Sequence, residues 1–132
     1  MTDKATLIEY RIREAEETLE DAEKMMAAGI KPRSITNRAY YAMFYAVLAL
    51  FNRFETPHRT SKHSTIIGIF NKEFVRTGKL EMRYSRMLYN LFDARQIGDY
   101  KDFVELTGED AESAVNQARE FIHAIKLLVV SE

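Results

Sequence analysis

Apolar residues recur at intervals of three and four along most of the chain, which is the spacing typical of amphipathic helices. In the first segment this stripe consists of Ile8, Ile12, Ala15, Leu19, Ala22 and Met26. No segment alternates apolar and polar residues with the period of two that marks a half-buried strand. The predicted helices span residues 8–29, 32–52, 61–78, 80–98 and 107–128.

Residues with known preferences for helix ends mark most of these boundaries. Gly29 suits a helix C-terminus, and Pro32 suits the first turn of the next helix. Ser61 is the expected N-cap of the short third helix, and Gly78 ends that helix. In the sequence TGED, Thr107 can cap the last helix, and Asp110, three residues later, completes a capping box.

The second predicted helix has two stripes of different size. The small stripe consists of Ala39, Ala42, Ala46 and Ala49, and the bulky stripe consists of Tyr41, Phe44, Leu48 and Phe51. Small side chains allow a close neighbour and large ones keep a neighbour at a distance, so two different helices should contact this one. We predict an all-α fold, an antiparallel up-down four-helix bundle with one additional short helix, in which residues 1–132 form a single domain.

Composition agrees with a globular protein, since 46% of the residues are hydrophobic and 30% are charged. The longest apolar run, residues 39–51, is too short to span a bilayer and suits a buried helix. The N-terminal segment is too polar for a signal peptide, and the chain has no cysteine for disulfides or thiolate metal sites. We therefore expect a cytoplasmic protein that does not interact with membranes.

Charge is distributed unevenly although the formal net charge is only -1. Residues 31–101 hold thirteen Lys and Arg against five Asp and Glu, whereas the remaining ends hold six against fifteen. Acidic terminal helices packed beside basic central ones would explain this pattern most simply. The alternative is a positive groove in the central segment that attracts phosphates.

Most motifs of catalytic or metal sites are absent from the sequence, including a glycine-rich phosphate loop, a nucleophile elbow and HExxH. Glu120 and His123 form one ExxH pair, but a di-iron bundle needs two such pairs and two further glutamates. We interpret this pair as a solvated surface pair. No metal and no cofactor are predicted.

Arg95 occupies the inward stripe of the predicted fourth helix, in register with Leu91 and Leu88. An unpaired buried charge is very costly, so Arg95 needs a carboxylate, water or a ligand, or else the stripe faces a cleft. The simpler interpretation is an ion pair with Asp99, four residues later. The functional interpretation is that Arg95, Asp99 and Tyr100 converge on a partly dry cleft, where the arginine fork suits phosphate.

Three further residues are candidates for binding. Arg38 is an isolated charge next to the aromatic stretch at residues 40–45. Tyr41 most simply fills the core, with its hydroxyl reaching a polar rim or a partner. His63 is in register with Ile67 at the start of the short helix, where a hydrogen-bonded packing role is commoner than a catalytic one.

Four segments together resemble the HEPN domain family over nearly the whole chain: NRAYYAMFYAVLALF, SKHSTIIGIFNKEFVRTGKL, DARQIGDY and EDAESAVNQAREFI. The specific features are an early R-x-YYA-x-F, a central K-H-S and a late R-x-x-x-D-Y, in this order. The resemblance implies a helical bundle that often dimerises and is frequently encoded beside a minimal nucleotidyltransferase. In many branches of the family the protein is a metal-independent ribonuclease toxin.

The nucleases of that family have an arginine followed after four to six residues by a histidine. Arg95 matches the arginine, but Tyr100, Lys101 and Asp102 occupy the positions where the histidine should fall. In the toxin branch a tyrosine two residues beyond the histidine is modified by the partner, and with Tyr100 in the histidine position this later position is Asp102. A tyrosine titrates near pH 10, so Tyr100 would be a poor base at neutral pH.

Three hypotheses follow. The preferred one is a module that binds a nucleotide or RNA phosphate, forms a homodimer and acts with a minimal nucleotidyltransferase in a toxin-antitoxin-like system. Its binding residues would be Arg95, Asp99, Tyr100, Arg38, Tyr41 and His63. The second is a ribonuclease toxin in which Arg95 stabilises the phosphate while Tyr100 or His63 moves the proton. The third is a structural dimeric scaffold without catalysis.

Overall fold

The computed structural model describes residues 3–100 and 105–130, apart from the side chains of residues 97–100. Its elements in order are α1 (Lys4–Ala27), α2 (Pro32–Arg53), α3 (His63–Phe70), the π-helical turn η1 (Asn71–Val75), α4 (Met82–Tyr100) and α5 (Gly108–Val130). These described residues contain no strand. The predicted all-α class is therefore confirmed.

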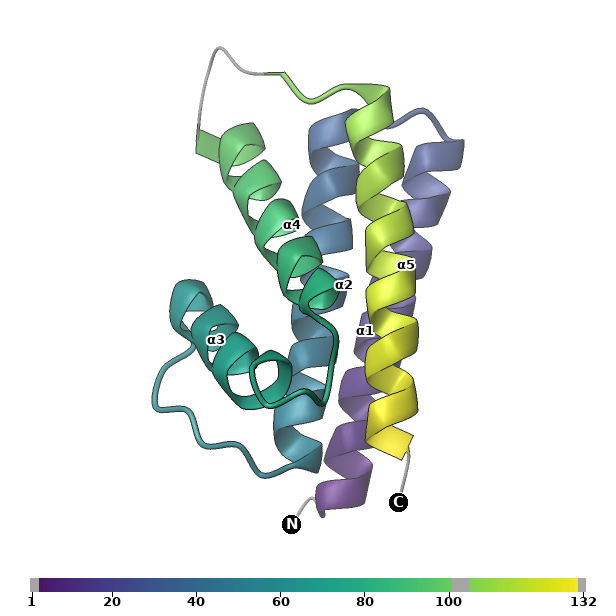
Figure 1. Ribbon diagram of the computed structural model, residues 1–132. Coiled ribbons are helices and arrows are strands. Elements are labelled where there is room, and N and C mark those ends of the chain that lie inside the picture. The colour runs from purple at the N-terminus through teal and green to yellow at the C-terminus, as the bar shows by residue number, and fades with distance from the viewer. Residues whose placement is uncertain (1–2, 101–104, 131–132) are drawn as a thin grey trace.

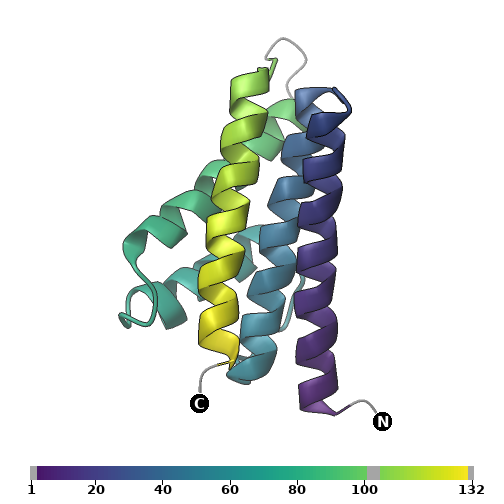
Figure 2. The same cartoon turned by 90° about the vertical axis from the view of Figure 1, so that its right-hand side faces the viewer.

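The long helices alternate in direction, as expected for an up-down arrangement. Figure 1 shows α1 and α4 ascending and α2 and α5 descending, with both termini at the lower end. Helices α1, α2 and α5 lie side by side along the long axis, whereas α4 crosses them obliquely and α3 lies beside the lower half of α2 (Figures 1 and 2).

Helix α2 is the centre of the core, because it contacts α1, α4 and α5. The four alanines of its small stripe are completely buried. All of the buried apolar side chains belong to one continuous cluster, to which every helix contributes. Among the described helices, none combines the length and the apolar character that crossing a membrane requires.

Several predicted helix ends are confirmed in detail. Gly29 has a φ of +73°, and the N–H groups of Gly29 and Ile30 donate to the carbonyls of Met26 and Met25, which is a Schellman motif. At the start of α5, the backbone N–H of Asp110 donates to Thr107 Oγ1 at 3.1 Å, and the Thr107 N–H donates to the Asp110 carboxylate at 2.8 Å. This is the reciprocal pair of a capping box.

Other predicted ends differ from the structure; α3 ends at Phe70 and η1 at Val75, before the predicted end at Gly78. Helix α1 begins earlier than the apolar pattern indicates, because Asp3 caps it by accepting a hydrogen bond from the Thr6 N–H at 2.7 Å. Lys62 instead of Ser61 is the N-cap of α3, and its side chain makes no capping hydrogen bond. Helix α4 continues through Gly98, since glycine inside a helix costs only about 1 kcal/mol relative to alanine.

Candidate functional site

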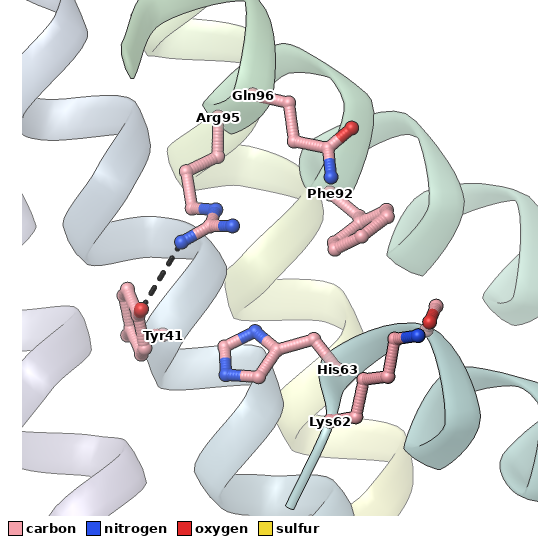
Figure 3. Close-up of a pocket in the computed structure, with 7 residues that line it drawn as sticks. Tyr41, Lys62, His63, Phe92, Arg95 and Gln96 are labelled. Atoms are coloured by element: carbon pink, nitrogen blue, oxygen red, sulfur yellow. Dashed lines mark hydrogen bonds between the residues drawn. The ribbon is translucent and has the colours of Figure 1, made fainter. Parts of the chain in front are cut away.

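A pocket of about 370 Å³ lies where α2, α4 and the beginning of α3 meet. Its lining residues are Tyr41, Lys62, His63, Ser64, Phe92, Arg95 and Gln96. Figure 3 shows the labelled side chains on three helices, with the Arg95 guanidinium directed from α4 towards Tyr41 on α2 and His63 below it at the start of α3. The oblique packing of α4 therefore creates the site, because it brings residues that are far apart in sequence to one cleft.

Arg95 is half-buried at the inner wall of this pocket. Its Nη1 donates to the Tyr41 hydroxyl at 3.1 Å, and its guanidinium carbon lies 5.2 Å from the centre of the Tyr40 ring and 5.9 Å from that of Phe92. Its Nε is buried and has no partner among the described residues. Aromatic rings thus hold the cation in place while part of its hydrogen-bonding capacity stays unused.

His63 is held by α2 as well as by its own helix. Its Nδ1 lies 2.7 Å from the Tyr40 hydroxyl, and its ring stacks on Phe44 with centroids 4.1 Å apart. Burial, with a smaller effect of the nearby Arg95 charge, lowers the pKa of His63. His63 is therefore a neutral imidazole at neutral pH.

The proton on His63 can be placed from Tyr40. Burial raises the pKa of Tyr40, so its phenol keeps its proton at any physiological pH. A buried hydroxyl needs an acceptor, and His63 Nδ1 is the partner that the structure provides. We infer that Tyr40 donates to Nδ1, which leaves the proton of the neutral ring on Nε2.

The charges around the pocket favour an anion. Lys62 and Arg95 both line it, and none of its seven described lining residues is acidic. Helix α3 starts here without a side-chain cap, so the N–H groups of His63 and Ser64 in its first turn add partial positive charge. The pocket therefore offers two cations and several donors to a ligand such as phosphate.

Arg38 lies beside this pocket instead of in it. Its guanidinium carbon is 5.2 Å from the centre of the Tyr41 ring, and its Nη2 donates to Asn37 Oδ1 at 3.1 Å. Arg38 lines an adjoining polar pocket of about 310 Å³ near the start of α2. Tyr41 thus lines the first pocket and contacts Arg38, which lines the second.

The sequence pair Glu120 and His123 is exposed on α5, and Glu120 forms an ion pair with Arg83 of α4. Within the described ranges, no three His, Cys, Asp or Glu side chains come together as a metal site. The geometry of this pair is that of solvated surface residues.

Comparison with known proteins identifies the family. The family model for the HEPN domain matches residues 8–128. The chain belongs to the HEPN domain family. A Thermotoga maritima protein named “UPF0332 protein” is 37% identical to it, over 98% of this chain and 96% of that protein. Two Methanocaldococcus jannaschii proteins named “Putative toxin” are 30% and 33% identical, over 95% and 90% of this chain and 83% and 86% of their own lengths.

This HEPN domain brings three of the sequence-predicted candidates together in the pocket: Arg95, Tyr41 and His63. Asp99 and Tyr100 lie on the last turn of α4, but their side chains are outside the described residues. The predicted Arg95–Asp99 ion pair and the role of Tyr100 therefore stay predictions.

Sequence reasoning missed four residues of the HEPN pocket: Lys62, Ser64, Phe92 and Gln96. Lys62 and Ser64 flank the histidine in the K-H-S motif, so their signal was present in the resemblance. Phe92 precedes Arg95 by three positions, and residues three apart lie on one helix face. Nothing in the sequence marked Gln96 as a pocket residue. It directly follows Arg95, which faces inward, so helical periodicity places Gln96 on the outward side of α4.

Proposed function

We propose that this HEPN protein is a toxin-like binding module that holds a phosphate of RNA or of a nucleotide in the Arg95 pocket. The observation that supports it is the convergence of Arg95, Lys62 and the uncapped start of α3 on a pocket whose described lining is free of carboxylates. The toxin-like character rests on the relatives named “Putative toxin”. A minimal nucleotidyltransferase as the partner rests on the family resemblance.

The arrangement explains how one phosphate would be held. Tyr41 accepts one Nη1 hydrogen of Arg95 and Nε is buried, so the other Nη1–H and the Nη2–H groups would bind the phosphate oxygens. Lys62 would supply a second positive charge at the rim.

Binding without catalysis is the function that these residues support best, because α4 has no histidine after Arg95 within the family spacing. Tyrosine ordinarily titrates near pH 10, so it is a poor substitute for the family's histidine as a base. The protein would therefore grip the phosphate through Arg95 without cleaving the strand.

The test measures RNA binding by fluorescence anisotropy in a buffer that contains a metal chelator. Labelled single-stranded RNA is titrated with the wild-type protein, with Arg95→Ala and with Arg86→Ala, an exposed arginine on the same helix that contacts Met82. We expect Arg95→Ala to weaken binding about tenfold or more, because hydrogen bonds to charged groups are among the strongest. Arg86→Ala should change the affinity less than about twofold.

Thermal melting of each variant shows whether the bundle is intact. An unchanged affinity of folded Arg95→Ala would contradict the proposal, as would the absence of RNA and nucleotide binding by the wild type. Arg95 would then be part of a structural scaffold.

A second candidate function is a metal-independent ribonuclease, and the position of His63 favours it. The structure brings this histidine from α3 into the same pocket as Arg95, and its lowered pKa keeps it neutral. A ring nitrogen of His63 would accept the proton of an attacking 2′-hydroxyl while Arg95 stabilises the phosphate; the P–O5′ bond would break, leaving a 2′,3′-cyclic phosphate, and the 5′-oxygen would take up the proton. Gel analysis of the RNA from the same titration decides, since cleavage that disappears in Arg95→Ala and His63→Ala would support the nuclease.

A further inference from the structure

We infer that the Arg95 pocket holds a nucleotide by two of its groups at once, with the phosphate on Arg95 and the unpaired base stacked on the ring of Phe92. This inference rests on the proposed function and adds a subsite for the base. The ligand class that it assigns is a phosphate that carries a nucleobase, either as a free mononucleotide or as one residue of single-stranded RNA.

The pocket is larger than a phosphate alone requires. Its volume of about 370 Å³ falls within the range of sites for small organic ligands, which is about 300–1,000 Å³. Arg95 and Lys62 provide the positive charge, and the rest of the lining includes the ring of Phe92 and the amide of Gln96. The pocket therefore has space and lining surface for the part of a ligand that is attached to the phosphate.

Phe92 offers an aromatic surface to this space. It is only partly buried, at the edge of the hydrophobic core. Its ring packs against the ring of Tyr40, with centroids 5.8 Å apart and planes at 46°. The remaining surface of the ring lines the pocket, where a flat group can cover it.

The other rings that line the pocket are less suited to stacking, because side chains already cover them. Aromatic rings surround that of Tyr41, namely those of Tyr40, Phe44, Tyr45 and His63. The guanidinium carbons of Arg38 and Arg95 also lie 5.2 and 5.7 Å from the centre of the Tyr41 ring. His63 stacks on Phe44 with centroids 4.1 Å apart. Phe92 therefore suits a stacked ligand better than Tyr41 or His63.

Phe92 and Arg95 are close enough to bind one nucleotide together. They are three residues apart on one face of α4, and the guanidinium carbon lies 5.9 Å from the centre of the ring. A phosphate bound to Arg95 can be no farther from the ring than this distance plus the length of one hydrogen-bonded contact. The sugar of a nucleotide spans such a separation, so the base attached to that phosphate can reach Phe92.

A base fits the groups around Phe92 better than an aliphatic chain does. Gln96 follows Phe92 by four positions on the same face of α4, and its amide is exposed next to the pocket (Figure 3). An apolar ring suits the flat face of a base, and an amide suits its polar edge. Stacking tolerates every base, because each has a π-face. The site should therefore distinguish nucleotides from base-free phosphates more strongly than one base from another.

The experiment compares three ligands by isothermal titration calorimetry: ribose 5-phosphate, UMP and AMP. Both nucleotides should bind wild-type protein more tightly than ribose 5-phosphate, AMP by about tenfold, because only they can stack. Phe92→Leu keeps an apolar side chain without the flat ring and should reduce the advantage of AMP to less than about twofold. Phe92→Tyr keeps the ring and should keep the advantage. Tyr89→Leu removes an exposed ring elsewhere on α4, so it is the matched control and should behave like wild type.

Fluorescence provides a second readout that a purely structural role of Phe92 would not change. The ligand is the 5′-monophosphate of 2-aminopurine riboside, whose emission is quenched by stacking and is well separated from that of the protein, which has no tryptophan. Saturating wild type and Tyr89→Leu should quench the emission, whereas saturating Phe92→Leu should quench it less. Thermal melting shows that each variant is folded.

The results separate this inference from the proposed function. If wild-type protein binds ribose 5-phosphate as tightly as AMP, or if folded Phe92→Leu keeps the advantage of AMP, the base subsite is wrong and the phosphate site at Arg95 stands. If the wild type binds none of the three ligands and no RNA, both proposals are wrong. The comparison of ligands on wild-type protein decides even if Phe92→Leu does not fold.

Discussion

At the scale of single residues, two adjacent tyrosines of α2 orient the polar groups of the pocket. The Tyr40 hydroxyl lies 2.7 Å from His63 Nδ1, whereas the Tyr41 hydroxyl accepts a hydrogen bond from Arg95 at 3.1 Å. Consecutive side chains on a helix point in different directions, so this pair can serve α3 and α4 at once. Their rings meet edge to face, with centroids 5.3 Å apart. The two tyrosines therefore hold His63 of α3 and Arg95 of α4 in position.

The environment of His63 predicts its titration. By NMR its ring should titrate below the ordinary histidine value of about 6.5, because burial and then the Arg95 charge disfavour the charged form. Arg95→Gln removes one of these two causes and should raise the midpoint, whereas Arg86→Gln should leave it unchanged. A midpoint at or above the ordinary value in wild type would contradict the geometry.

The lowered pKa of His63 also makes the free energy of unfolding depend on pH. As pH falls through the pKa of the unfolded chain, the unfolded state takes up a proton on His63 before the folded state does. His63 therefore lowers the stability of the fold as pH falls through this window. His63→Gln should make the stability less sensitive to pH between about 7 and 5.

At the scale of elements, the starts of α3 and α5 differ in how their first backbone N–H groups find hydrogen-bond acceptors. Helix α5 starts with a complete capping box, so its N-terminal N–H groups are satisfied by its own side chains. Helix α3 starts at Lys62 without such a cap, and this start faces the Arg95 pocket. A helix start that is left open next to two cations suits anion binding, whereas the capped one serves stability.

The capping box of α5 predicts that removing its threonine makes the protein measurably less stable. Thr107→Ala should lower the free energy of unfolding by about 1 kcal/mol, because the N–H of Asp110 loses its acceptor. Ser113→Ala, in the exposed middle of the same helix, is the control and should not destabilise the protein, since alanine is the better helix former. Chemical denaturation of both variants measures the difference. Equal stability of Thr107→Ala and wild type would mean that the capping box contributes nothing.

At the scale of the whole molecule, charge and apolar surface are both distributed unevenly. Helix α1 holds seven acidic residues against four basic ones, whereas residues 31–101 hold thirteen Lys and Arg, on α2, on α4, on η1 and in the connections between helices. The simpler interpretation of the charge pattern accounts for pairs such as Arg83 with Glu120, which join the middle to an end. Around Arg95 and Arg38 no such pair is found within the described residues, which favours the phosphate interpretation there.

Self-association is predicted from a half-buried stripe on α2. Tyr41, Tyr45 and Leu48 are spaced four and three residues apart and remain partly exposed, as a helix-on-helix contact with a second copy requires. Light scattering should give the mass of a homodimer. Tyr45→Glu should shift the protein towards monomer because it adds a charge to the contact. Tyr10→Glu, at an exposed tyrosine of α1, is the control and should leave the mass unchanged. A monomeric wild type at all concentrations would refute the dimer.

The helices, their order and several of their ends are determined by the sequence itself. The spacing of apolar residues, Gly29, Pro32 and the pair of Thr107 with Asp110 act over a few residues, so their effect can be derived locally. The inward position of Arg95 is predicted in the same way, because helical periodicity places it below Leu88 and Leu91, which are buried. Ser61 is not the cap of α3, since a capping residue type is only one of several ways to start a helix.

The pocket is decided only by the tertiary structure. Tyr41 and Arg95 are 54 positions apart, and Tyr40 and His63 are 23 positions apart. Their contacts depend on the angle at which α4 crosses α2 and on where residues 54–62 place the start of α3, and both follow from packing over the whole core. Helical periodicity predicts on which face of its own helix a side chain lies. The packing of the helices determines which residues of other helices that side chain contacts.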